Sequence, residues 1–376
     1  MPQINLAAEF DSRIAERLKM TLSTEEAVNH SYKFDGADTV HITSVDTMPM
    51  HDYQRNGVSR YGNPLDIGDS EQTYTLKMDR SFTGIIDKGD VQDQKIQKSA
   101  SEALKRQTDE VINPEINKYR LAAMAKKPGY VAVNNNLATI GDGAAHIYEA
   151  ILNMSVAARN KLAPATGGVI FCVPEVIAML LQSDGKFLQY TDRSQEYKIK
   201  GVIGEIDGKR IVEVPRELMP TNCVMIMGHK DATVAVEKLK DFVIHENPPG
   251  INGNLIEGRI RYDAFVLDTK VPMIGAVYSA GTVCTEPTIS YAGGKLTLTA
   301  GDGETIKYTT DGTDPRTSLT VQTYSSAVTT GWNESNGNTT VKAYATKSGS
   351  IASGVSKAVI PAASALSRFH GNGTSF

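Results

Sequence analysis

Few residues of the sequence stand at spacings that could perform metal or phosphate chemistry. His245 and Glu246 begin like the first two residues of a zinc-protease helix, but no second histidine follows four residues later. The glycine pair around Asp142 (141–143) lacks the further glycines or the Gly-Lys-Ser/Thr ending of a phosphate-binding loop. We therefore expect His245 on the surface and Asp142 near the start of a helix, where a carboxylate suits the exposed N–H groups.

The cysteines and the acidic pairs also give no sign of catalysis. Cys172, Cys223 and Cys284 are far apart and lack the short spacings of zinc sites or disulfide frameworks. The first two lie inside apolar stretches, where core packing is favoured over reactivity. Glu205 and Asp207 flank a turn, which is typical of solvated residues. No nucleophile motif such as Gly-x-Ser-x-Gly is present, so we expect no enzyme and no catalytic, cofactor or metal site.

Composition excludes further classes of protein. The 376 residues carry 39 Lys and Arg against 43 Asp and Glu, a net charge of -4, which disfavours a nucleic-acid binder that is basic throughout. The N-terminus has no apolar core segment, so no secretory signal is expected. No run approaches the roughly 18 apolar residues of a membrane helix, so we expect no membrane partner. The length favours two domains.

A change of composition near residue 284 marks the boundary between them. All 12 methionines lie at or before Met273, whereas 25 of the 77 residues in 285–361 are Ser or Thr. Threonine favours strands, and methionine suits adaptable packing against helices. We predict a larger domain over 1–282, a small all-β domain over 283–361, and a loose tail over 362–376.

The first domain begins with two extended features. An arm over 1–38 precedes an alternating strand at 39–45, and a second alternating stretch follows at 70–87. The long polar segment between them predicts an extended hairpin over 39–87. Its polar faces cannot stabilise it alone, so we expect it to dock on a neighbouring chain.

A long helix and a mixed sheet follow. Apolar residues recur every three or four positions from about 90 to 126, which predicts a long amphipathic helix that Pro114 should kink or divide. The rest of the domain, 127–282, mixes helices with strands, so the class is α+β. Its expected elements are a helix at 146–162, a buried strand at 167–174, a helix opening at Pro174, a hairpin turning at Asp207–Gly208 and a buried strand at 223–229.

This order of elements resembles the major capsid proteins of tailed bacteriophages. The resemblance lies in the residue patterns of two stretches, GVIFCVPEVIAMLLQS (168–183) and RIRYDAFVLDTKVPMIGAVYSA (259–280). No single motif is diagnostic of the family. The resemblance covers about residues 1–282. It implies the Johnson fold, which encapsulin shells share, with an N-terminal arm, an extended loop, a spine helix, and axial and peripheral domains.

The second domain resembles the C-terminal domain of chitobiase and beta-hexosaminidase, an immunoglobulin-like sandwich. The resemblance lies in TIKYTTDGTDPRTS (305–318), TYSSAVTT (323–330) and TTVKAYATKSGSIASGVSKAVI (339–360). Alternation in the last stretch places Val341, Ala343 and Ala345 on one face, and Lys342 and Tyr344 on the other. Short strands with turn signals at regular spacing agree with a sandwich.

The capsid resemblance implies a structural protein of the virion. Its copies would form the pentamers and hexamers of an icosahedral head around double-stranded DNA, assembled in the bacterial cytoplasm, with a portal. Only about 30 residues precede the first strand, so a separate scaffolding protein is expected. DNA would be contacted weakly, with Arg106, Lys118 and Arg120 of the spine helix as candidates; an ordinary solvated helix face explains these residues equally well.

The appended sandwich is expected to face outward and to offer aromatic faces to glycans. Trp332, Tyr324 and Tyr344 are the candidate contacts, and a tryptophan of the sandwich core is the alternative for Trp332. Other interpretations of the whole chain remain open. They are an encapsulin-type compartment that packages a cargo enzyme, a secreted glycan-active enzyme with a chitobiase-type module, and a surface adhesin.

Overall fold

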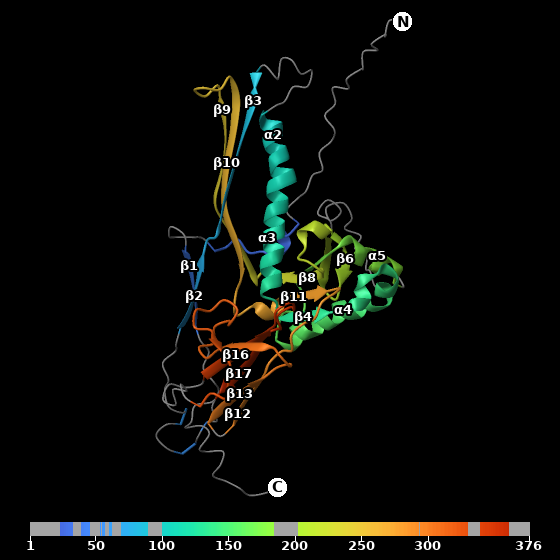
Figure 1. The fold of residues 1–376 in the computed structure, drawn as a ribbon, viewed down its shortest axis with the longest axis vertical. Helices are drawn as coiled ribbons and strands as arrows, with labels where there is room; N and C mark the ends of the chain where they lie inside the picture. The colour runs from blue at the N-terminus through green and yellow to red at the C-terminus, as the bar shows by residue number, and fades with distance from the viewer. Residues whose placement is uncertain are drawn as a thin grey trace.

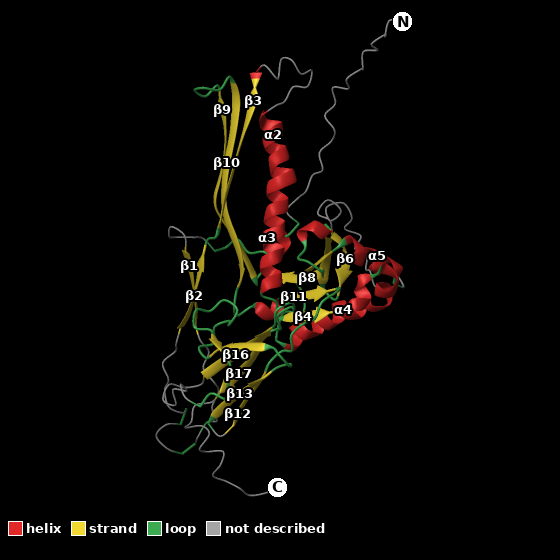
Figure 2. Ribbon diagram, in the orientation of Figure 1, coloured by secondary structure: helices red, strands yellow, loops and turns green. Residues whose placement is uncertain are grey.

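The computed structural model describes residues 23–32, 39–45, 53, 55–56, 60–61, 69–88, 100–183, 202–292, 294–329 and 339–360. The predicted tail, most of the arm and most of the hairpin tip lie outside these residues. The fold is α+β, as predicted, and its parts follow one long axis (Figure 1). A long sheet with a helix beside it forms one end, a compact sheet with two helices lies to one side, and a β-sandwich forms the other end (Figure 2).

The compact part is a six-stranded sheet in the order β4-β11-β8-β5-β7-β6. Its two central strands are buried, as their continuous apolar runs predict. Helices α4 (Ile140–Asn160) and α5 (Pro174–Gln182) pack together beside it and complete the main core of the chain. The strands are β4 (Tyr130–Val133), β11 (Gly275–Tyr278), β8 (Cys223–His229), β5 (Gly168–Cys172), β7 (Lys209–Glu213) and β6 (Val202–Ile206).

Local signals in this part of the sequence are confirmed. Asp207 and Gly208 both have positive φ, 50° and 70°, as the tight turn between β6 and β7 requires. Pro174 opens α5 at a position where its missing N–H costs nothing. Helix α4 starts six residues earlier than predicted, and Asp142 lies in its first turn, where it accepts a hydrogen bond from the Thr139 hydroxyl over 3.0 Å.

The long part is an antiparallel sheet in the order β3-β10-β9, covered by the long helix. The strands are β3 (Met78–Asp87), β10 (Gly253–Val266) and β9 (Thr233–Glu246), and the helix consists of α2 (Ala100–Gln107), a π-helical turn η2 (Thr108–Ile112) and α3 (Asn113–Lys126). Ile112 and Ile116 pack against Ile260 and Tyr262 of β10.

The helix does not divide at Pro114, contrary to one of the two expectations. Pro114 stands in the first turn of α3, directly after the π turn. A proline removes one hydrogen bond and crowds the carbonyl four residues earlier, and a wider turn at that point accommodates both effects. The predicted stretch ahead of Ala100 lies outside the described residues.

The predicted hairpin needs a correction. Strand β1 (Thr39–Val45) pairs with β2 (Asp69–Thr75), Thr39 opposite Thr75, but the segment predicted as one strand over 70–87 is divided. Leu76 is buried, and the N–H of Lys77 donates to the Asp263 carboxylate over 3.2 Å, after which β3 joins β10. Apolar and polar residues alternate through both strands, so this pattern could not reveal that the pairing partner changes between them.

The last part is the predicted all-β module. Its sheets are β12-β13 and β15-β14-β16-β17, and Leu296, Leu298, Ile306, Tyr308 and Val341 form its separate core. The strands are β12 (Thr288–Ala292), β13 (Lys295–Thr299), β15 (Gln322–Thr323), β14 (Thr305–Thr309), β16 (Thr339–Thr346) and β17 (Ser356–Ile360).

Candidate functional site and assembly surfaces

The end of the arm is anchored on the long helix through Arg120. This side chain is 2% exposed and donates to Glu25 Oε1 over 2.8 Å, to Glu237 Oε1 over 3.4 Å and to the Thr24 hydroxyl over 3.3 Å. The Asn117 side-chain oxygen accepts from the hydroxyl of Thr24 over 2.9 Å. A guanidinium enclosed in this way cannot reach a phosphate, so the suggestion that Arg120 contacts DNA is wrong.

The charges around Arg120 favour the ionised form of Glu25. Burial alone would raise the pKa of Glu25, but the hydrogen bond and charge of Arg120, together with those of His30, outweigh it and lower that pKa. The other two DNA candidates lie on the surface. Arg106 forms an exposed ion pair of 3.2 Å with Glu110, and Lys118 is exposed. Of the three, Lys118 has an exposed charge, and no ion pair joins it to another described residue.

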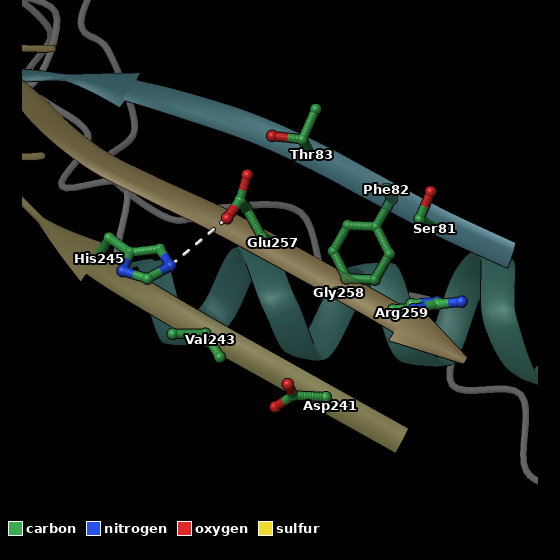
Figure 3. Close-up of a pocket in the computed structure, with 9 residues that line it drawn as sticks. All are labelled: Ser81, Phe82, Thr83, Asp241, Val243, His245, Glu257, Gly258 and Arg259. Carbon is green, nitrogen blue, oxygen red and sulfur yellow. Dashed lines mark ion pairs between the residues drawn. The ribbon is translucent and has the colours of Figure 1, made fainter. Parts of the chain in front are cut away.

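A shallow hollow of about 610 Å³ lies on the long sheet (Figure 3). Several of its polar groups are paired: His245 Nε2 lies 3.4 Å from Glu257 Oε2, and Arg259 forms two hydrogen bonds, of 2.9 and 2.6 Å, to Asp79. His245 is therefore a surface histidine, as predicted. Solvated, paired charges on a strand face suit contact with another protein surface better than acid–base chemistry, because no side chain is held apart from water. The hollow is lined by Ser81, Phe82 and Thr83 of β3, by Asp241, Val243 and His245 of β9, and by Glu257, Gly258 and Arg259 of β10.

Gly258 makes close packing possible in the middle of this sheet. A Cβ there would lie 2.3 Å from the Phe82 ring and 2.6 Å from the Phe242 ring. The centroids of the two rings are 5.8 Å apart, and both residues stand opposite Gly258 on the flanking strands. The glycine is therefore needed for space.

The base of the hairpin docks on its own chain. The Tyr74 ring stacks on Phe265 at a centroid distance of 3.9 Å and an angle of 10°, and Ile42 packs against the same small cluster. Farther out, the rings of Tyr53 and Tyr61 meet edge to face at 5.1 Å, and 85% of Tyr61 is exposed. The hairpin is thus fixed at its base, while aromatic surface toward its tip faces solvent.

The module meets the rest of the chain through a loop that the sequence marked only as a turn. Arg316 donates through Nε and Nη2 to the two carboxylate oxygens of Asp314, over 3.1 and 2.8 Å, and through Nη1 to the carbonyl oxygen of Pro128 over 2.8 Å. Lys127, at the foot of the long helix, forms an ion pair with Asp268 and lies 4.0 Å from Asp314 Oδ2. We call Lys127, Asp268, Asp314 and Arg316 the junction cluster.

Every side chain of the junction cluster is at least nine-tenths buried. Burial alone would raise the pKa of Asp314, but the hydrogen bonds and charge of Arg316 and the charge of Lys127 outweigh it and lower that pKa. No motif could have revealed the cluster, because Lys127 and Asp268 stand 141 positions apart, and Asp268 and Asp314 stand 46 apart.

The predicted glycan contacts are not brought together by the part of the module that the structure describes. Trp332 lies outside the described residues. Tyr324 packs beside Tyr308 at a centroid distance of 6.3 Å, against the module core. Tyr344 stands opposite Lys307 on the other face of the sheet, where burial raises the pKa of its hydroxyl.

The three cysteines are free thiols packed in the interior. Burial raises the pKa of Cys223 to about 12 and also raises that of Cys172 strongly, so neither forms a thiolate readily. Among the described residues, no three His, Cys, Asp or Glu side chains gather as metal ligands. Within the same residues, no helix is long and apolar enough to cross a membrane.

An extended hairpin, a long helix on a three-stranded sheet and a compact sheet flanked by two helices make up the Johnson fold of phage capsid subunits. The predicted fold is thereby confirmed. The chain aligns with a solved chain from Mycobacterium phage Che8 at 18% identity and a TM-score of 0.57. It also aligns with the mature capsid of bacteriophage PhiM1 at 15% identity and a TM-score of 0.53. A third alignment, with the capsid of cyanophage P-SCSP1u, has 13% identity and a TM-score of 0.55. Each alignment covers 74% of this chain, and 98%, 92% and 93% of the other chain, respectively.

The module has a relationship of its own. Residues 286–357 match the family described as the chitobiase/beta-hexosaminidase C-terminal domain, which confirms the predicted resemblance. No curated protein sequence matches the chain.

Proposed function

We propose that this chain is the major capsid protein of a tailed bacteriophage. Its copies form pentamers and hexamers that close an icosahedral head around double-stranded DNA. One observation carries the proposal: the chain contains nearly the whole length of solved phage capsid subunits in the same fold, 92% of one and 93% of another. The proposed role is therefore structural, that of a shell subunit.

The unmatched quarter of the chain corresponds in size to the module together with the C-terminal tail. We propose a shell domain over 1–282, with an arm over 1–38, an extended loop over 39–87, a spine helix over about 90–126 and axial and peripheral regions over 127–282. The immunoglobulin-like domain covers 283–361 and the tail 362–376. The match at 286–357 supports the second of these domains. In the assembled head the module faces outward.

The hairpin supplies the proposed contact between subunits. A ring of identical subunits requires each copy to place one surface on a different surface of the next. Beyond the docked base, the described part of the hairpin exposes Tyr61, so aromatic area is available to a neighbour. The long sheet, with its solvated and paired charges, offers a polar surface for such a contact.

The same proposal implies the other partners. The interior touches DNA weakly, which agrees with a net charge of -4, the burial of Arg120 and the pairing of Arg106. A separate scaffolding protein and a portal complete the assembly in the bacterial cytoplasm. Glycan contact by Trp332, Tyr324 and Tyr344 stays a prediction, and a glycan array probed with assembled particles would test it.

Electron microscopy of the expressed chain, alone and with a scaffolding protein from the same genome, tests the proposal. Closed icosahedral particles are expected, whereas monomers under every condition would contradict it. Particles that enclose a cargo enzyme in place of DNA would favour the encapsulin-type alternative. Hydrolysis of chitin oligomers would favour the glycan-active enzyme.

A matched pair of variants tests the hairpin contact. Tyr61→Ser should reduce particle yield without changing the thermal unfolding of the unassembled chain, because Tyr61 is 85% exposed. Leu319→Ser removes a fully exposed apolar side chain from the module and should leave the yield unchanged. Equal yields for Tyr61→Ser and the wild type would remove this residue from the proposed contact.

A further inference from the structure

Asp268 lies where three parts of the chain meet. It follows the end of β10, and its side chain is 7% exposed. Lys127, which caps the long helix, forms an ion pair with one of its carboxylate oxygens. The backbone N–H of Asp314, in the module, donates to the other over 3.1 Å. The helix and the module therefore share one carboxylate.

The hairpin also reaches this carboxylate, at the oxygen that pairs with Lys127. The Tyr74 hydroxyl lies 3.4 Å from Asp268 Oδ1 and 3.3 Å from the carbonyl oxygen of Val266. The backbone N–H of Asp268 donates to the Gln72 side-chain oxygen over 3.4 Å, and the Tyr74 hydroxyl donates to that oxygen over 3.0 Å. Gln72 and Tyr74 both belong to β2, so the base of the hairpin is tied to the junction cluster.

The covalent connection to the module is also held in place. The N–H of Cys284 donates to the carbonyl oxygen of Ile351 over 2.9 Å. The N–H of Ile351 in turn donates to the carbonyl oxygen of Thr282 over 2.8 Å. Lys161 of the shell part donates to Glu286 over 3.4 Å and to the carbonyl oxygen of Gly129 over 3.1 Å. A domain attached only through a flexible linker would lack these hydrogen bonds.

We propose that the module braces the hairpin. By holding Asp268 and Lys127, the module loop from Asp314 to Thr317 fixes the angle between the β1–β2 hairpin and the long helix. The hairpin then leaves the subunit in one direction. The brace acts within a single chain, so it goes beyond the proposed assembly and does not depend on it.

Hydrogen exchange of the unassembled full-length chain, followed by mass spectrometry, tests the brace. Arg316→Ala removes the side chain that holds Asp314 and the Pro128 carbonyl. The amides of Thr73–Thr75, which pair with Thr39–His41, are expected to exchange about tenfold faster, within the usual range of coupling between sites. Lys347→Ala is the matched control, because Lys347 is an exposed module cation whose ammonium group, among the described residues, donates to the carbonyl oxygen of Asp302 in the module; it should leave the hairpin unchanged.

Coupling is reciprocal, so the hairpin must also act on the module. Tyr74→Phe removes the hydroxyl that reaches Asp268 and keeps the ring that stacks on Phe265. The amides of Thr317 and Ser318, both bonded to the Asp314 carbonyl, should then exchange faster by a similar factor.

Faster exchange confined to the module loop in Arg316→Ala, with Thr73–Thr75 at the wild-type rate, would overturn the brace. If Arg316→Ala unfolds the whole module, Thr317→Ala replaces it under the same criterion, because it removes only one hydrogen bond, of 3.2 Å, from Lys127. A chain that shows the coupled exchange but forms no particles would refute the proposed assembly and leave the brace standing.

Discussion

At the scale of residues, the buried cations of this chain hold segments together. Arg120 fastens the end of the arm to the long helix, and Arg316 fastens the module loop to Pro128. A guanidinium suits both positions, because its several N–H groups can bind two or three oxygens at once and its charge is never lost. The sequence could not distinguish Arg120 from Lys118, since both are cations on one helix and burial depends on which side the arm covers.

Replacing Arg120 with methionine should destabilise the fold. The variant keeps much of the apolar stem but loses the bonds to Glu25 and Thr24, so the free energy of unfolding should fall by about 2–3 kcal/mol. Urea denaturation followed by circular dichroism measures the change. Lys118→Met is the matched control, and its effect should stay within about 0.5 kcal/mol because Lys118 is exposed. Equal effects of the two variants would show that the anchor contributes nothing.

At the scale of elements, the sequence predicted which segments are strands better than which strands pair. The hairpin turn at Asp207–Gly208 has its own local chemistry, so it was found correctly. The change of partner between β2 and β3 rests on Asp263, which lies 186 positions from Lys77. Such a long-range contact leaves no mark on the alternation of either strand. The same holds for Gly258, whose need for space comes from rings on two other strands.

Two glycines of the long sheet should respond oppositely to alanine. Gly258→Ala drives a methyl group into the Phe82 and Phe242 rings and should cost about 1–2 kcal/mol of stability, as overpacking does. Gly84→Ala meets no atom within 4 Å and should keep or raise stability by about 0.5 kcal/mol, because alanine orders a strand better than glycine. Thermal unfolding of both variants measures this difference, and a Gly258→Ala variant as stable as Gly84→Ala would contradict the packing argument.

At the scale of the whole molecule, the Johnson fold and the chitobiase-type module were predictable, whereas the connection between them was not. The order of elements and the change of composition are properties of the chain itself. The junction cluster is a property of the folded molecule, because its members come from the helix foot, the end of β10 and a module turn. The module was expected as an outward appendage, a position that stays a prediction; within one chain it forms a buried contact with the shell part.

Acid should weaken this contact. The pKa of Asp314 is lowered in the folded chain by Arg316 and Lys127, with Asp268 and Lys342 also nearby. Its stabilising contribution is therefore complete above about pH 5 and is lost as the pH falls below about 4, through the folded-state pKa. Urea midpoints of the wild type and Asp314→Asn should differ at neutral pH and converge in acid. Asp302→Asn, a control at an exposed position, should have the urea midpoint of the wild type at every pH. If the midpoints of the wild type and Asp314→Asn still differ in acid, the ionised Asp314 is not the source of this stability.

The burial of all three cysteines has a practical consequence. Because Cys172, Cys223 and Cys284 are enclosed, a cysteine placed at the fully exposed position 319 would be the one thiol per subunit open to a maleimide reagent. A particle built from such subunits would carry its labels in a regular lattice set by the shell. The same chain would then serve as a scaffold for displaying a chosen molecule at a fixed spacing.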